Sequence, residues 1–227
     1  MSIPRIIHHV FLSSLPLSEA LKKEEEEKER IRFNSKYRVF RQSWFKYHGD
    51  FNFAMWTLKE LTNFLTLDKN CAEILCGNFP YVIKSDIARF IILYWVGGVY
   101  VDTDMEAVNN ISKLMECKSF AGESYPPNGI GNAIVGGEPH NELFLEIAKR
   151  SAMEVLQSKE QAIRRPDLYG VQIAGKMLKD VELIYPRKYF YPFSWKELEK
   201  RENTWFDSYA VHHWYGMNED GWTNKKY

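Results

Sequence analysis

Apolar and polar positions along this chain alternate between a two-residue and a 3.6-residue period. Runs rich in apolar and β-branched residues predict strands at 5–12, 51–56, 99–102, 119–122, 133–135, 184–191 and 209–214. Helical stripes or strong helix formers predict helices at 38–47, 58–67, 80–96, 141–158, 172–178 and 195–201. No repeat, low-complexity tract or linker separates these elements, so the chain is expected to form one α/β domain over residues 1–227.

A highly charged segment follows the first predicted strand. It reads SEALKKEEEEKERIRF from Ser18, a residue suited to cap a helix, and Glu24 with Lys28 and Glu26 with Arg30 stand at favourable helical spacing. We therefore expect 18–47 to be a charged helical excursion at the periphery of the domain, with a solvated face. A partner-binding arm is the alternative interpretation.

The most informative stretch is PYVIKSDIARFIILYWVGGVYVDTDME, residues 80–106. Its first half carries apolar residues at helical spacing, and Gly97 and Gly98 then end the helix as a glycine C-cap does. A short strand from Val99 runs into the acidic pair Asp102 and Asp104. This succession of helix, turn, strand and acidic pair predicts an α/β unit with functional residues at the end of its strand.

The acidic pair predicts a divalent cation site. Residues two apart on a strand project from the same face, so Asp102 and Asp104 can reach one point. Cations such as Mn²⁺ and Mg²⁺ prefer oxygen ligands and keep positions open for phosphate oxygens. Charge at the end of a buried strand costs free energy unless a cation offsets it. The alternative interpretation is one helix-capping aspartate beside an exposed one.

Composition narrows the classes of function. Thirty Lys+Arg balance thirty Asp+Glu, and this zero formal charge argues against a nucleic-acid binder. The uncharged run 90–101 is too short to cross a bilayer, no signal peptide is recognisable, and the three cysteines fit reduced thiols. We therefore expect a soluble cytoplasmic protein, with peripheral attachment to the inner face of the membrane left open. The 15% aromatic share favours core packing over a stacking site for sugars or bases.

Three strings, IPRIIHHVFL, SDIARFIILYWVGGVYVDTDM and YAVHHW, stand in this order between Ile3 and Trp214. They resemble glycosyltransferase family 32, the DXD-containing sugar transferases common in bacterial capsule and O-antigen assembly. The resemblance implies a single GT-A-like domain, whose Rossmann-type mixed sheet is flanked by helices and binds a nucleotide-sugar with Mn²⁺ or Mg²⁺. It also implies a retaining reaction, either by same-face attack or through a covalent intermediate.

The central string implies the catalytic and donor-binding residues. By the resemblance, Asp104 binds the metal directly and Asp102 contacts the metal, the ribose or both. Tyr100 is placed to touch the donor, while Asp86 and Arg89 match positions that bind the donor sugar and diphosphate. Arg89 in an apolar helix needs a partner, which is either Asp86 or a phosphate. A purely structural Asp86–Arg89 ion pair is the alternative.

The terminal strings imply the base contact and the third metal ligand. Phe11 stands where relatives often carry Trp, and it is expected to stack on the base, with uracil and guanine both open. His8 is a candidate donor contact, and the alternative is that His8 and His9 only pack or form hydrogen bonds inside the protein. His212 is expected to complete the metal shell, with His213 as second choice, because strand alternation lets only one of them face the cation.

The sequence also departs from the family pattern. Relatives often carry Ser-Trp where this chain has Met217–Asn218, and Trp222 is the candidate replacement. Glu123 and Asn132 follow the metal strand at spacings seen in the family and are candidate sugar or acceptor contacts. Gly170–Val171 replaces a Gly-Pro turn, so acceptor specificity cannot be read from the sequence.

The resemblance implies transfer of a hexose from a nucleotide-sugar, UDP- rather than GDP-linked, to a glycan or lipid-linked acceptor in surface polysaccharide synthesis. Two alternatives stay open, a nucleotide-sugar hydrolase and a non-catalytic nucleotide-sugar or carbohydrate-binding protein. A phosphatase with a nucleophilic aspartate is disfavoured. Its acidic motif would follow an early strand, whereas the acidic pair of this chain begins at Asp102, after a glycine turn. The oligomeric state is left open.

Overall fold

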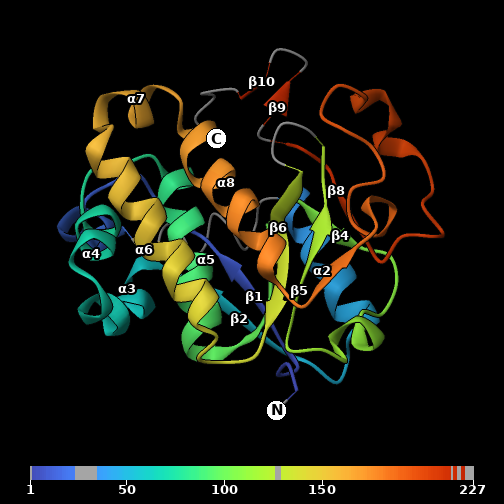
Figure 1. Cartoon of the computed structure of the whole chain (residues 1–227). Coiled ribbons are helices and arrows are strands. Elements are labelled where there is room, and N and C mark those ends of the chain that lie inside the picture. Colours follow the sequence, from blue (N-terminus) through green and yellow to red (C-terminus); the bar gives the residue numbers. More distant parts are fainter. Residues whose placement is uncertain (1, 24–34, 126–128, 216, 219–220, 223–227) are drawn as a thin grey trace.

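A mixed sheet of six strands runs through the molecule in the order β2-β1-β3-β6-β5-β7 (Figure 1). The computed structural model describes residues 2–23, 35–125, 129–215, 217–218 and 221–222, with the backbone alone at 35, 36, 167, 217, 218, 221 and 222. The strands of this sheet are β1 (Ile6–Val10), β2 (Asn52–Trp56), β3 (Gly98–Val101), β5 (Ser119–Glu123), β6 (Ile130–Gly137) and β7 (Leu183–Tyr185).

Strand direction decides which loops meet. β1 is parallel to both β2 and β3, so the carboxyl ends of these three strands lie at one edge of the sheet. β6 is antiparallel to β3 and β5, while β5 and β7 are parallel. The residues that follow β1 and β3, although about 90 positions apart in the chain, therefore emerge side by side.

Helices cover both faces of the sheet. The α-helices are α2 (Ser35–Tyr47), α3 (Leu58–Leu61), α4 (Lys69–Cys76), α5 (Tyr81–Val96), α6 (Glu142–Gln157), α7 (Lys159–Arg164) and α8 (Pro166–Met177). Short 3₁₀ helices are η1 (Thr62–Leu67), η2 (Ser112–Met115), η3 (Leu178–Asp180), η4 (Arg187–Tyr189) and η5 (Leu198–Glu202). The predicted α/β class, with a mixed sheet flanked by helices, is confirmed.

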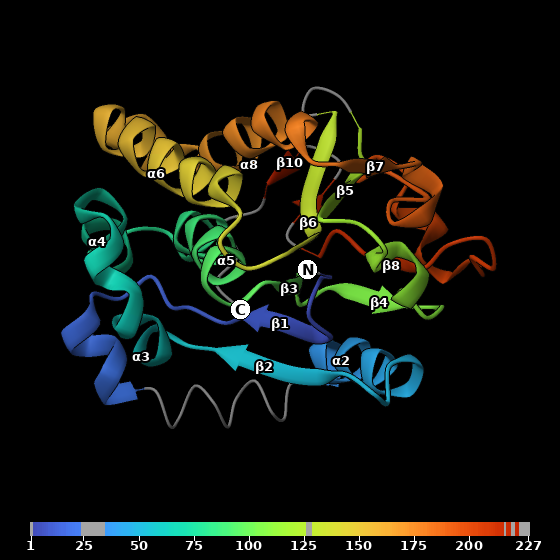
Figure 2. The same ribbon diagram turned by 60° about the horizontal axis from the view of Figure 1, so that its bottom comes forward.

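Two hydrophobic cores lie on the two faces of the sheet. One is built from α4, α5, α6 and α8, the other from α2 and the C-terminal segments (Figure 2). α5 is apolar over most of its circumference because it lies between the sheet and the outer helices α6 and α8. This arrangement buries Arg89 and Asp86 along with the apolar residues of the helix. Their charges must therefore be neutralised by partners inside the protein.

Two small sheets complete the fold. β4 (Met105–Ala107) pairs antiparallel with β8 (Ala210–His212), and β9 (Met217–Asn218) pairs with β10 (Gly221–Trp222). β4 begins directly after the acidic pair, so its pairing with β8 brings the C-terminal histidines to that pair. Periodicity did not predict β4, because three residues are too few to show alternation.

Several predicted elements were wrong in extent. The sequence missed α4 and α7, and α8 begins at Pro166 rather than 172, because proline is favoured at a first helical position. The predicted strand 184–191 ends at Tyr185, since Pro186 interrupts it. The predicted helix 195–201 is only the 3₁₀ turn η5, where Glu197 bonds the backbone and hydroxyl of Ser194.

The charged excursion is only partly described. Residues 17–23 are helical, and the expected ion pairs of Glu24 with Lys28 and Glu26 with Arg30 lie outside the described residues. Among the residues that the structure does describe, no helix combines the length and apolar character needed to cross a bilayer.

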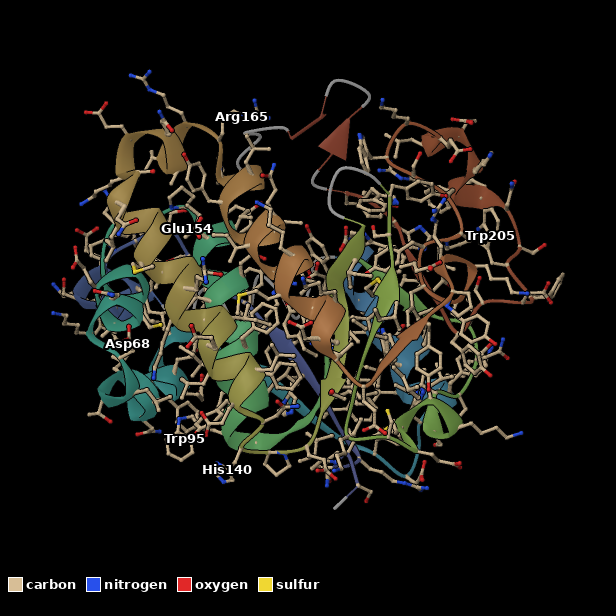
Figure 3. The ribbon with its side chains drawn as sticks, viewed as in Figure 1. Asp68, Trp95, His140, Glu154, Arg165 and Trp205 are labelled. Carbon is tan, nitrogen blue, oxygen red and sulfur yellow. The ribbon has the colours of Figure 1, made fainter. Side chains whose placement is uncertain are left out.

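Aromatic side chains mostly serve packing, as the composition favoured. Trp44 is fully buried and donates its indole N–H to the carbonyl of Met105, joining α2 to β4. At the edge where α5 ends, Trp95 lies beside His140, with ring centroids 5.7 Å apart (Figure 3). This cluster lies at the amino end of β3, away from the acidic pair.

We predict that Gly98→Ala lowers the free energy of unfolding by more than about 2 kcal/mol. Gly98 has φ +93°, and an added Cβ would lie 2.7 Å from the Ile6 carbonyl oxygen and 2.8 Å from the His8 ring. Urea denaturation measures the loss. Gly49→Ala is the matched control, because no atom of the described residues lies within 4 Å of its added Cβ. Equal stability of the two variants would contradict this account of the turn.

Candidate metal and donor site

Three groups suited to bind a cation meet at the carboxyl edge of β3. Ligand atoms of Asp102, Asp104 and His212 all lie within 4.8 Å of one another. Asp102 follows β3, Asp104 precedes β4, and His212 ends β8, which pairs with β4 through Met105. The structure thus brings together three of the residues expected to bind metal, and their role as ligands stays a prediction.

Asp102 is held by two neighbours that share one of its oxygens. The Tyr100 hydroxyl donates to Oδ1 at 2.6 Å, and Arg89 Nη1 lies 3.1 Å from the same atom. Both contacts therefore use Oδ1, and Oδ2 is the oxygen left to turn toward a cation. Tyr100 is only 2% exposed and carries the Arg89 guanidinium over its ring at 4.4 Å. Tyr100 thus lies where it orients Asp102, rather than open to a donor.

Each nitrogen of Arg89 has at least one partner inside the protein. Nη2 bonds Asp86 Oδ1 at 2.8 Å, Nη1 donates to the Asn132 carbonyl at 2.6 Å, and Nε donates to the Ser85 carbonyl at 3.3 Å. The Asn132 amide also donates to Asp86 Oδ1 at 2.9 Å. Asp86 and Arg89 thus form an ion pair, and Arg89 also contacts Asp102.

Asp86 is enclosed by a glycine on α8. A Cβ added to Gly170 would lie 2.1 Å from Asp86 Oδ2, a buried oxygen that has no hydrogen-bond partner in the part of the chain that the structure describes. Burial raises the pKa of Asp86 to about 6, and Arg89 opposes that rise. Any larger residue at 170 would push α8 away from α5, so this glycine sets the distance between the two helices.

Asp104 is held by the C-terminal segment. Its Oδ1 lies 3.2 Å from His212 Nε2, and its Oδ2 accepts the Tyr215 backbone N–H at 2.9 Å. Burial alone would raise the pKa of Asp104, but His212 and the Tyr215 N–H outweigh it and lower that pKa to about 2. For His212, burial lowers the pKa, yet the two carboxylates reverse this and raise it.

The charge balance of this cluster fits a divalent cation. Asp86, Asp102 and Asp104 carry three negative charges against the single positive charge of Arg89, which leaves two negative charges when His212 is neutral. Burial, together with the nearby Asp104, raises the pKa of Asp102. His212 Nδ1 is buried without a hydrogen-bond partner among the described residues. Two carboxylates and an imidazole are ligands that Mn²⁺ accepts.

The second C-terminal histidine faces elsewhere. His213 Nε2 lies 2.8 Å from Glu106 Oε2, and its ring stacks on Phe40 with centroids 4.5 Å apart. This geometry agrees with the expectation that strand alternation lets only one of the pair face the cation. It favours His212 over His213 as the ligand.

At the start of the chain, His8 and His9 are both buried. Trp56 Nε1 donates to His8 Nδ1 at 3.0 Å, so Nδ1 is unprotonated and Nε2 donates to the Gly97 carbonyl at 2.8 Å. Both ring nitrogens of His8 are thereby occupied, and neither is left for a donor. The His9 ring lies near the Val101 backbone, and its nitrogens form no well-defined hydrogen bond with the described residues.

The remaining candidates lie at varied distances from the cluster. Phe11 is half-buried directly after β1, and its N–H donates to the Trp56 carbonyl, so it lies at the same sheet edge as Asp102. Asn132 is buried against Asp86 and is not open to an acceptor. Glu123 is exposed at the end of β5. The backbone of Trp222 lies in β10, and its side chain is outside the described residues.

Sequence reasoning missed three contributors to the site, which are Tyr191, Tyr215 and the contact of Gly170 with Asp86. Tyr191 is buried with its ring edge-on to His212 at 5.8 Å, and its hydroxyl accepts the Ala133 N–H at 3.2 Å. Tyr215 contributes its backbone N–H, and a backbone contact cannot be predicted from the type of side chain. The contact of Gly170 could have been suspected only because a glycine inside a helix often marks a close approach to a neighbour.

We predict that Arg89→Met lowers the free energy of unfolding by about 4 kcal/mol, because it leaves Asp86 and Asp102 buried without their cation. Arg150→Met is the matched control. Arg150 lies 3.6 Å from Glu154 on an exposed face, so its loss is expected to cost less than about 1 kcal/mol. Urea denaturation measures the free energy of unfolding of both variants. Similar decreases in the two variants would contradict the stabilising role of Arg89.

A second prediction concerns acid stability. Burial lowers the pKa of His9 from 6.5 to about 4, so the unfolded chain binds this proton more tightly than the folded one. The stability of the wild type relative to His9→Leu should therefore fall by about 3 kcal/mol as the pH drops from 7 to 4. A stability difference that stays constant over this pH range would rule out a buried neutral His9.

Part of this chain is similar in sequence to known proteins. Residues 35–121 match the family described as the glycosyltransferase sugar-binding region containing a DXD motif. The chain is 25% identical over 103 residues to inositol phosphoceramide mannosyltransferase 3 of Schizosaccharomyces pombe, covering 45% of this chain and 29% of that protein. It is 27% identical over 156 residues to human alpha-1,4-N-acetylglucosaminyltransferase, covering 61% and 44%. The chain thus spans less than half of either relative.

Two solved structures share the fold. The PaToxG glycosyltransferase superimposes with a TM-score of 0.52 at 15% identity, covering 78% of this chain and 69% of that one. Mouse xyloside xylosyltransferase 1 gives a TM-score of 0.50 at 9% identity, covering 92% and 97%. These likenesses show a GT-A fold. The matched DXD region and the mannosyltransferase relative support the resemblance read from the sequence, which is to DXD-containing glycosyltransferases of the family 32 type.

Proposed function

We propose that this chain transfers a hexose, with retention, from a nucleotide-sugar to a hydroxyl of a glycan or a lipid-linked acceptor. The observation that carries the proposal is the meeting of Asp102, Asp104 and His212 at the carboxyl edge of the parallel strands. In an open α/β sheet this edge is where a nucleotide binds. UDP is favoured over GDP as the donor nucleotide.

Asp102, Asp104 and His212 would hold Mn²⁺ or Mg²⁺, which when bound supplies Lewis-acid stabilisation to the departing diphosphate. The Tyr215 N–H orients one oxygen of Asp104, and Tyr100 with Arg89 orients Asp102. Because all nitrogens of Arg89 have protein partners, its contribution is to hold Asp102 and Asp86 rather than to grip a phosphate directly.

Phe11 is proposed to stack on the donor base. It lies at the end of β1, next to the strand that leads into Asp102, and it is half-buried with a π-face of the kind that bases stack on. Glu123 and Trp222 are the proposed sugar or acceptor contacts that remain, since Asn132 is committed to Asp86.

The relatives inform the acceptor only broadly. One is named for mannose transfer to inositol phosphoceramide and the other for transfer of N-acetylglucosamine, so the sugars in their names differ. A lipid-linked or glycan acceptor is consistent with either name. A role in surface polysaccharide synthesis at the cytoplasmic face of a membrane remains our proposal.

Two competing functions predict different behaviour. A nucleotide-sugar hydrolase would release free sugar at the full rate without an acceptor. A non-catalytic binding protein would need a pocket but no complete metal shell, and the triad of Asp102, Asp104 and His212 argues against it.

We predict that Asp104→Asn lowers kcat/KM for sugar transfer in Mn²⁺ at least about 100-fold, because it removes a charged ligand. The assay offers UDP- and GDP-hexoses with a panel of glycan and lipid-linked acceptors, and it measures both transfer and free sugar. Asp207→Asn, at an exposed position, is the control. An undiminished rate in Asp104→Asn would remove the metal role of this residue. Full release of sugar without acceptor would favour the hydrolase.

A further inference from the structure

A strained turn follows the two C-terminal histidines. Trp214 has φ +55°, a left-handed conformation that is unfavourable for a residue with a side chain. Its indole N–H donates to the Phe193 carbonyl at 2.9 Å, and its ring lies 4.1 Å from that of His212. The turn is therefore packed directly against the third candidate metal ligand.

This turn determines how Asp104 is held. The N–H of His213 donates to the Asp104 carbonyl at 3.1 Å, and the N–H of Tyr215 donates to Asp104 Oδ2 at 2.9 Å. The positive φ of Trp214 lies between these two bonds. If Trp214 relaxed to the extended conformation of a strand, the Tyr215 N–H would no longer point at the carboxylate.

One guanidinium contacts all three residues of this turn. Arg201 Nε donates to the His213 carbonyl at 2.6 Å, and Nη2 donates to the Trp214 carbonyl at 2.9 Å. Its Cζ lies 4.6 Å from the centre of the Tyr215 ring. Arg201 comes from η5, in the C-terminal segment that continues to Trp205 in Figure 3.

The backbone of residues 213–215 thus binds one partner through its N–H groups and a different partner through its carbonyl groups. Its N–H groups hold Asp104, and two of its carbonyls are held by Arg201. We propose that Arg201 is a positioning residue for the cation site, acting through the Trp214 turn on Asp104 and His212. This inference rests on the proposed metal-dependent function of the same site.

The chemistry of the contact requires arginine. A guanidinium offers several N–H donors in a rigid plane that can reach two successive carbonyls, and the same plane lies over an aromatic ring. A lysine ammonium keeps the charge but is a flexible point donor, which cannot hold both carbonyls in this geometry. Arg201→Lys therefore separates geometry from charge.

The test is Mn²⁺ binding to the whole chain, measured by calorimetry and by electron paramagnetic resonance of free Mn²⁺. We expect Arg201→Lys to raise the Kd for Mn²⁺ by about 10- to 100-fold, the range for losing a group that orients a ligand. The Mn²⁺ concentration for half-maximal sugar transfer should rise in parallel, while the rate at saturating Mn²⁺ largely recovers. A loss of stability alone would not shift these metal-binding curves.

Lys200→Met is the matched control, because Lys200 lies in the same η5 turn and pairs with Glu197 rather than with 213–215. Its Kd for Mn²⁺ should match the wild type. Arg201→Gln, planar but with fewer donors, is the second variant and carries the test if Arg201→Lys does not fold. A wild-type Kd in a folded Arg201 variant, or an equal shift in Lys200→Met, overturns the inference.

The same experiments separate this inference from the proposed function. A wild-type chain that binds Mn²⁺ with the expected shift in Arg201→Lys, yet transfers no sugar, overturns the proposed function alone. A chain that transfers sugar with a wild-type Kd in Arg201→Lys overturns the role of Arg201 alone. A wild-type chain that binds no Mn²⁺ overturns both.

Discussion

The site depends on the burial of one guanidinium. Arg89 is 4% exposed in a helix that is apolar on nearly every side, and its charge is tolerable because Asp86 and Asp102 neutralise it and two backbone carbonyls accept hydrogen bonds from it. This network ties α5 to the end of β3, so the orientation of Asp102 is set by the packing of the helix. Tyr100, under the guanidinium, adds a second bond to the same oxygen.

The opposite half of the site is built by a different kind of constraint. Asp104 is held from the C-terminal segment, through the imidazole of His212 and the backbone of Tyr215, which lie more than 100 residues away in sequence. Antiparallel pairing of β4 with β8 supplies the register that brings them there. The two aspartates of the motif therefore have separate supports, one in each hydrophobic core, and a cation between them would join the two halves.

The parts of the fold that could be predicted were those whose pattern lies within one contiguous stretch of the sequence. The helix, glycine turn, strand and acidic pair between 81 and 104 follow from local periodicity and from the freedom of glycine to adopt positive φ, which Gly97 and Gly98 both show. The failures, at 184–191 and 195–201, came where apolar and aromatic residues suggested regular structure while Pro186 and the Ser194–Glu197 contacts favoured short turns. Local hydrogen bonds there outweighed the pattern.

The sequence by itself determined the fold class, the family resemblance and the three candidate ligands Asp102, Asp104 and His212, because each is carried by spacing or by residue type along the chain. Only the tertiary structure decided how they are used. It showed that both nitrogens of His8 are occupied, that Asn132 serves Asp86, and that His213 turns to Glu106 while His212 turns to Asp104. Those outcomes depend on which face of a strand meets which neighbour, and strand register is fixed by packing over the whole molecule rather than by any local segment.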